Sequence, residues 1–82
     1  MNYQELFNLE VARTNNYVSS LVDQKVIEDF YMGSEYLGGA GKVWINLVRN
    51  QTAFQVEVIV GDKNVMKLVG MVRELIRNTL VL

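Results

Sequence analysis

Two segments of alternating apolar residues, separated by three polar ones, constrain the fold of this chain more than any other feature. Within 42–49 the apolar residues Val43, Ile45 and Leu47 alternate, and the same alternation runs through 53–60. A period of two places these side chains on one face of an extended strand. Because the linker Asn50-Gln51-Thr52 is short and polar, the pattern predicts an antiparallel β-hairpin. Its inward face would carry Val43, Ile45, Leu47, Phe54, Val56, Val58 and Val60.

The second face of this hairpin is less polar than a face that meets only water. An isolated two-stranded sheet is marginally stable in water, and exposed apolar patches commonly mark contact sites. We therefore expect another part of the structure to cover this face or to extend its edges. The residues on it would be Trp44, Asn46, Val48, Gln55, Glu57 and Ile59.

A helix is predicted over residues 65–79, where apolar residues recur at helical spacing. Asp62 or Asn64 is placed to cap its first turn. The apolar end Leu80-Val81-Leu82 has to dock against the rest of the chain or form a short extra strand. The stripe that this helix would present to the core consists of Val65, Leu68, Val69, Val72, Leu75, Ile76 and Thr79.

Residues 3–32 show a helical pattern that is interrupted once. Apolar residues recur at three- and four-residue steps on both sides of Thr14-Asn15-Asn16, whose side chains compete for backbone hydrogen bonds. This predicts two helices, 3–13 and 16–32, with one continuous helix as the alternative. The glycine-rich residues 33–41 then predict a loop.

Helices and strands are segregated along the chain, which indicates an α+β fold with the order α-α-β-β-α. A chain of 82 residues is too short for two separate hydrophobic cores, so residues 1–82 are expected to form a single domain. No apolar run approaches the roughly 20 residues that span a bilayer, and the N-terminus lacks the features of a targeting signal. These observations predict a cytoplasmic protein with no direct membrane insertion.

The chain contains no cysteine, histidine or proline, which narrows its chemistry. It can form no thiolate nucleophile, imidazole base or Cys/His zinc site, and its serines have no histidine to activate them. Glu28 and Asp29 would point about 100° apart on a helix and so would not converge on one substrate. Glu57 is interpreted as a surface charge or a partner of Arg49. We predict a protein that is not an enzyme and that binds no cofactor or metal, with an enzyme using Glu57 or Glu35 as the alternative.

The formal net charge of −1 gives no basic surplus for binding nucleic acid, although it hides an asymmetry. Residues 1–40 carry six acidic and two basic side chains, whereas residues 41–82 carry six basic and three acidic ones. Gly38–Lys42 lacks both the Ser/Thr and the following helix that a phosphate-binding loop needs. Trp44 has too few basic neighbours in the sequence for a base-stacking groove. A small nucleic-acid-binding regulator is therefore the alternative function.

Residues 41–80 combine a glycine-led strand, a short turn, a valine-rich second strand and a helix. The residues that carry this pattern are Gly41-Lys42-Val43, Phe54–Val60, Val65, Val69 and Val72. In these features the chain resembles the alkaline shock protein family of Gram-positive bacteria. The family's usual Glu-Tyr-Gly and Ile-Pro segment is replaced here by Gly61-Asp62-Lys63-Asn64. The resemblance implies a non-enzymatic, oligomer-forming protein tied to the cell envelope through a membrane-bound partner.

The surplus of apolar surface indicates association. Half of the residues are hydrophobic, yet a chain this short buries only about 60–65% of its unfolded surface. Two-sided strands and a helix stripe widened by Met66 and Met71 are buried most simply against another copy. We predict an oligomeric structural or adaptor domain that acts through protein–protein contacts, as a homo-oligomer or with a protein partner. The residues predicted at the interface are Trp44, Val48, Ile59, Met66, Met71 and Leu80.

Overall fold

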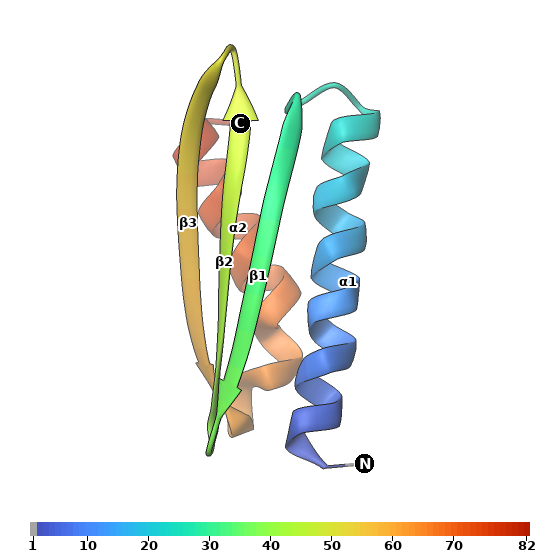
Figure 1. Ribbon diagram of the computed structural model, residues 1–82, viewed down its shortest axis with the longest axis vertical. Coiled ribbons are helices and arrows are strands. Elements are labelled where there is room, and N and C mark those ends of the chain that lie inside the picture. Colours follow the sequence, from blue (N-terminus) through green and yellow to red (C-terminus); the bar gives the residue numbers. More distant parts are fainter. Residues whose placement is uncertain (1) are drawn as a thin grey trace.

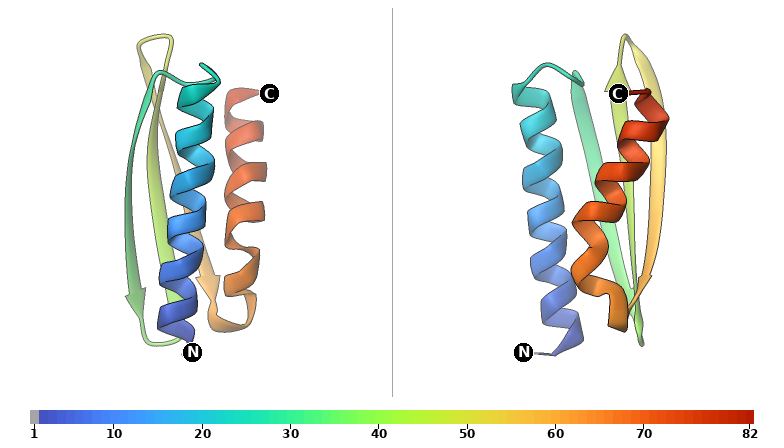
Figure 2. Two further views of the ribbon diagram at one scale, coloured as in Figure 1. Left: turned by 90° about the vertical axis from the view of Figure 1, so that its right-hand side faces the viewer. Right: turned by 180° about the vertical axis from the view of Figure 1, so that it is seen from behind.

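The protein is a two-layer α+β structure in which two helices cover one face of a three-stranded antiparallel sheet (Figure 1). The computed structural model describes residues 2–82. Figure 2 shows in its left view that both helices lie on the same side of the sheet, side by side. The elements are α1 (Tyr3–Asp23), β1 (Asp29–Leu37), β2 (Ala40–Arg49), β3 (Thr52–Gly61), the 3-10 helix η1 (Asp62–Lys67) and α2 (Leu68–Leu80).

The predicted hairpin is confirmed as strands β2 and β3. Arg49 pairs with Thr52, and the register continues to Ala40 opposite Gly61. Asn50 and Gln51 both have positive φ values, 54° and 61°, which is the backbone of a type I′ turn. This turn matches the right-handed twist of the two strands, so two residues suffice to reverse the chain.

The hydrophobic core lies between the sheet and the helices. Val56 and Val58 are buried, as the alternation in the hairpin predicts. Phe7, Val18 and Leu21 of α1 reach the same core, although α1 is polar over most of its surface. The segment before β1 adds Ile27 and η1 adds Val65. The sheet and α2 supply the other buried hydrophobic side chains, which are Val43, Ile45, Leu47, Val60, Leu68, Val72, Ile76 and Leu80.

The N-terminal half differs from the prediction. Helix α1 runs through Thr14-Asn15-Asn16 without a break, because the Thr14 hydroxyl donates to the Glu10 carbonyl of its own helix at 2.8 Å. The predicted helix over 16–32 is wrong beyond Asp23, since Lys25 takes a left-handed φ of 61° that no helix accommodates. Residues 29–37 form a third strand, so the observed order is α-β-β-β-α.

Strand β1 pairs with β2 along its whole length and completes the sheet order β1-β2-β3. Its partly buried side chains, Phe30, Met32 and Tyr36, alternate and pack against the core. The loop predicted for 33–41 is therefore reduced to the turn at Gly38-Gly39, where φ is +24° and +90°. Only glycine adopts the second of these conformations without strain.

Two glycines inside strands make room for aromatic rings on opposite faces of the sheet. A Cβ atom added at Gly41 would overlap the ring of Phe7, which lies on the helix side. A Cβ atom added at Gly33 would overlap the indole of Trp44, which lies on the other side. In both positions a ring covers the exposed backbone of a strand glycine, an arrangement that offsets the weak strand propensity of glycine.

The predicted C-terminal helix is confirmed, although its first turns form the 3-10 helix η1 and it extends to Leu80. No side-chain hydrogen bond caps η1 or α2, so the capping role predicted for Asp62 or Asn64 is wrong. Leu80 docks in the core, and its carbonyl accepts a hydrogen bond from Arg49 Nη1 at 3.0 Å. Val81 then ends the helix in a left-handed conformation, and no extra strand follows within the described residues.

Candidate interaction surface

The face of the sheet that lies opposite the helices is covered by no other element of residues 2–82 (Figure 2). We call this surface the outer face. Three large apolar side chains are prominent on it, with exposed fractions of 71% for Tyr31, 68% for Leu37 and 63% for Ile59. Leu37 and Ile59 lie at the end near the glycine turn, where they line one shallow hollow together with Ala40.

Trp44 occupies the centre of the outer face. Its indole lies across Gly33 of the neighbouring strand and is therefore covered on one side by its own chain. Opposite it on β3 stands Glu57, as the hairpin geometry predicts. Glu57 forms an ion pair of 3.7 Å with Lys42, not with Arg49, which is occupied by the end of α2. Both partners of this pair are partly exposed, so the pair contributes little stability.

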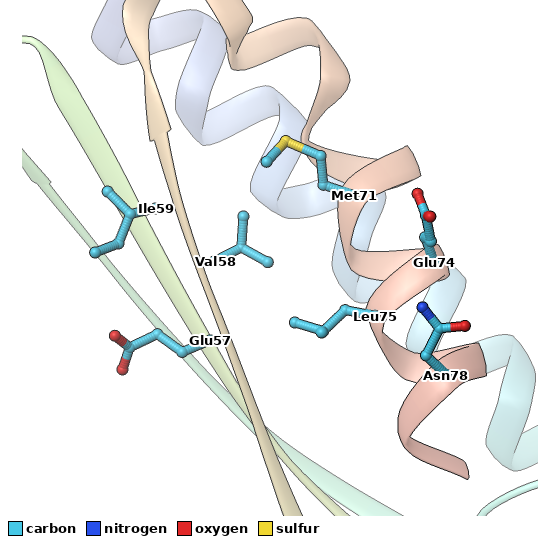
Figure 3. A pocket seen from close by; sticks show the side chains of 7 residues that line it. All are labelled: Glu57, Val58, Ile59, Met71, Glu74, Leu75 and Asn78. Carbon is cyan, nitrogen blue, oxygen red and sulfur yellow. The ribbon is translucent and has the colours of Figure 1, made fainter. Parts of the chain in front are cut away.

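A groove runs between the free edge of β3 and helix α2 (Figure 3), and we call it the β3–α2 groove. Its volume is about 440 Å³. Leu75 and Val58 point into the space between strand and helix in this view, whereas Glu57 projects from the opposite side of β3. The lining residues are Glu57, Val58, Ile59, Met71, Glu74, Leu75 and Asn78.

The acidic residues considered for catalysis do not converge. Glu57 and Glu74 border the β3–α2 groove from opposite sides, and their carboxylates point away from each other (Figure 3). Glu28 Oε1 accepts a hydrogen bond from the backbone N–H of Gln51 at 3.1 Å, and Asp29 Oδ1 accepts one from the N–H of Phe30 at 2.8 Å. Both carboxylates therefore accept backbone hydrogen bonds at the end of the sheet where β1 begins and β2 turns into β3.

Glu35 stands opposite Lys42 in the register of β1 and β2, on the outer face. Lys42 thus has Glu35 across one strand boundary and Glu57 across the other. With Asp29 included, the outer face carries three carboxylates and one ammonium group. The surface is therefore apolar with an acidic surplus.

The exposed side of η1 and α2 is basic, in contrast to the acidic outer face. Arg73 lies over the ring of Tyr17, with the guanidinium carbon 5.3 Å from the ring centroid. This distance is within the range of a cation–π contact between the helices. The exposed basic residues of these two elements are Lys63, Lys67, Arg73 and Arg77, against the single exposed acid Glu74. The outer face is thus acidic, whereas the exposed side of η1 and α2 is basic.

A polar contact ties the glycine turn to the start of η1. The Tyr36 hydroxyl donates to Asp62 Oδ1 at 2.7 Å, and the Asp62 N–H donates to the Gly39 carbonyl at 3.1 Å. The hydrogen bond to the Asp62 carboxylate raises the pKa of Tyr36 above its ordinary value of 10. The contact fixes the path of the chain from sheet to helix.

The six residues predicted at an interface fall into four places. Trp44, Val48 and Ile59 share the outer face, as predicted. Met71 lines the β3–α2 groove together with Ile59, and Met66 is exposed in η1. Leu80 is only 7% exposed in the core of its own chain, so it is not available to a second one.

Tyr31 and Leu37 are the most exposed apolar residues of the outer face, and neither is among the residues that the sequence pattern predicts at an interface. They lie in β1, a segment that was predicted as helix and loop. The alternation of Phe30, Met32 and Tyr36 could have indicated a strand, but the apolar neighbours Tyr31 and Leu37 and the glycine at position 33 obscure it.

Comparison of the chain with known protein families, with curated proteins and with solved structures finds no match. Neither helix of residues 2–82 is both long enough and apolar enough to cross a membrane. Within the same residues, no three acidic side chains are grouped closely enough to hold a metal ion.

Proposed function

We propose that this chain is a non-enzymatic association domain that acts through protein–protein contacts at the outer face of its sheet. The observation that carries the proposal is the placement of both helices on one face, which leaves Tyr31, Leu37 and Ile59 exposed on the other. Exposed apolar side chains on an uncovered sheet face, with charges among them, are typical of contact sites on small domains. Cytoplasmic localisation remains a prediction from the sequence.

The chemistry of the outer face favours a protein over a nucleic acid as its partner. Binding to phosphates requires several Lys or Arg side chains, and this face offers only Lys42 among three carboxylates. Tyr31 and Trp44 supply the rigid aromatic area that dominates the energetics of protein interfaces. We accordingly propose self-association as the basic activity, with the same face available to an adaptor partner.

The experiment is a dilution series with light scattering on the wild type and two lysine variants. We expect the wild type to exceed its monomer mass of 9.4 kDa at high micromolar concentration. Ile59→Lys should weaken association at least tenfold, because it places a charge in an apolar contact. Met66→Lys is the matched control, since Met66 is equally exposed, at 61%, but lies in η1.

Circular dichroism should show that both variants keep the secondary structure of the wild type. A wild type that stays monomeric at every concentration would contradict self-association. Equal behaviour of Ile59→Lys and Met66→Lys in a wild type that does associate would contradict the assignment of the outer face.

A further inference from the structure

Strand β3 is an unprotected edge of the sheet. The strand order β1-β2-β3 leaves β3 with a neighbour on one side only. It is ten residues long, rich in valine, and has a single charged residue, Glu57, which is engaged with Lys42. Natural proteins blunt such edges with charges, prolines, bulges or a covering element, because unpaired backbone groups recruit another strand. β3 has none of these beyond Glu57.

The hairpin register identifies which backbone groups of β3 are unpaired. In a two-residue hairpin, the pair that flanks the turn exchanges hydrogen bonds, and every second pair after it does the same. Starting from Arg49 and Thr52, this alternation directs the N–H and C=O groups of Phe54, Val56 and Val58 toward β2. The groups directed to the free edge belong to Ala53, Gln55, Glu57 and Ile59.

Strand β1 forms the other edge of the sheet, and it carries features that prevent another strand from pairing with it. In β1, the free N–H of Phe30 is already bound by the Asp29 carboxylate at 2.8 Å. Asp29 and Glu35 place two negative charges along this strand, and the adjacent Glu28 adds a third at its start. Helix contact does not distinguish the two edges, because α1 packs against β1 and α2 packs against β3. The charges and the bound N–H of β1 leave β3 as the edge at which another strand can pair.

We propose that β3 pairs antiparallel with β3 of a second copy of this chain, about a two-fold axis at Val56, and forms a continuous six-stranded sheet. The proposal rests on the self-association proposed above, but it does not use the outer face as the contact. In this dimer the helices of both copies lie on one side of the sheet, and the two outer faces form one continuous surface on the other.

The choice of axis follows from side-chain pairing across the edge. Centred on Val56, the two strands overlap from Thr52 to Val60, and Gln55 of one copy stands opposite Glu57 of the other. A register centred on Glu57 would instead place two carboxylates directly opposite each other, which is destabilising. A register centred on Gln55 would shorten the overlap at the valine-rich end. Charge and length therefore select the same register.

The same axis brings the start of the second β3 to the β3–α2 groove. Val58 lines this groove two residues from the axis, and in this register it stands opposite Phe54 of the second copy. Met71 and Leu75 supply apolar area on the helix side of the groove. Each copy offers its groove to the other, so the contact occurs twice, as a two-fold interface requires.

The first test compares two proline variants by light scattering and circular dichroism. Gln55→Pro removes an N–H that points to the free edge, and proline is tolerated at such positions. We expect a folded monomer, with the dissociation constant raised at least a hundredfold. Val56→Pro is the matched control, because its N–H is bound within the chain; it should lose the fold itself.

The second test maps the register with single cysteines, which the native sequence lacks entirely. In an antiparallel two-fold dimer, only the residue on the axis meets its own copy. The Cα atoms of such a non-hydrogen-bonded pair lie about 4.5 Å apart, within the range of a disulfide. The cross-linked fractions are compared at equilibrium in a thiol–disulfide redox buffer, because Val56 is buried and a thiol there would meet an oxidant slowly. We expect a larger cross-linked fraction for Val56→Cys than for Gln55→Cys or Glu57→Cys. A larger fraction for either neighbour than for Val56→Cys would overturn the register.

The outcomes separate this inference from the proposed function. A wild-type monomer at all concentrations would overturn both, and β3 would then be open to an extended segment of another protein. A wild-type dimer that Ile59→Lys dissociates and Gln55→Pro leaves intact would overturn the β3 edge while supporting the outer face. A dimer that responds only to Gln55→Pro supports the edge and overturns the outer face as the self-association contact.

Discussion

The contact between Phe7 and Gly41 yields the sharpest prediction for stability. A Cβ atom added at Gly41 would lie 2.8 Å from Cζ of Phe7, and closer still to Cδ1 and Cε1 of the same ring. Ordinary carbon–carbon contacts are about 3.5–4.0 Å, so the ring has to retreat by roughly 1 Å. Phe7 is fully buried and its ring centroid is 5.7 Å from that of Tyr36, which limits this movement. We expect Gly41→Ala to lower the free energy of unfolding by about 2 kcal/mol.

Urea denaturation, followed by Trp44 fluorescence and far-ultraviolet circular dichroism, measures this loss. A small domain has a denaturant slope of about 1 kcal/mol per molar urea, so the midpoint should fall by about 2 M. Gly61→Ala is the matched control. Gly61 is also a strand glycine with negative φ, and its nearest neighbouring atom would be 4.0 Å from the added Cβ.

A double-mutant cycle with Phe7→Leu tests the cause as well as the size of the effect. If the ring is the obstacle, Gly41→Ala should cost much less in the Phe7→Leu background than in the wild type. The two single losses would then exceed the loss in the double variant by at least 1 kcal/mol. Additive losses, or a Gly41→Ala variant as stable as Gly61→Ala, would refute the reasoning.

Three further predictions concern single side chains. Glu10 is buried, its Oε2 accepts no hydrogen bond, and Arg13 Nη1 lies 3.6 Å from this atom. Because a neutral side chain is less costly to bury there, Glu10→Gln should raise the free energy of unfolding by about 1 kcal/mol, as measured by urea titration. Because the hydrogen bond to Asp62 raises the pKa of Tyr36, the folded chain holds the phenol proton more tightly than the unfolded chain does. This contribution is complete below pH 10 and is lost as pH rises through the folded-state pKa, so the urea midpoints of wild type and Tyr36→Phe should converge in alkaline solution. Val58→Asp should unfold the chain, because a buried unpaired carboxylate costs several kcal/mol, and a cooperative thermal transition in this variant would contradict the burial of Val58.

The hairpin and the C-terminal helix could be predicted because the spacing of their apolar residues fits only one kind of element in each case. Apolar residues recur at every second position in the hairpin and at three- and four-residue steps in the helix. In β3, valine at positions 56, 58 and 60 fits a strand and no helix face. The turn at Asn50-Gln51 adds a local signal, since asparagine tolerates positive φ. The outer-face positions of Trp44, Val48 and Ile59 then follow from the strand period alone.

Strand β1 could not be predicted in this way, because its pattern is ambiguous. The series Val18, Val22, Val26 and Phe30 has a step of four, which is one turn of a helix but also two periods of a strand. Gly33 falls inside the strand, and glycine ordinarily marks a loop. Its place in β1 depends on the Trp44 ring that covers it from the neighbouring strand. That contact is tertiary, so no window of local sequence contains it.

The strands lie in the sheet in the same order as in the chain, so their contacts join residues that are close in sequence. The contacts of α1 differ, because some of them join residues from opposite ends of the chain. Each strand pairs with its neighbour in sequence, so the meander closes only short loops and forms at little entropic cost. Helix α1, by contrast, meets η1 and α2 from the far end of the chain. We expect its amide protons to exchange with solvent before those of β2, through openings that leave the sheet and α2 assembled. Release of α1 would uncover the apolar inner side of the sheet at Gly41. The docking of α1 on the sheet therefore determines how long this apolar surface stays protected from solvent.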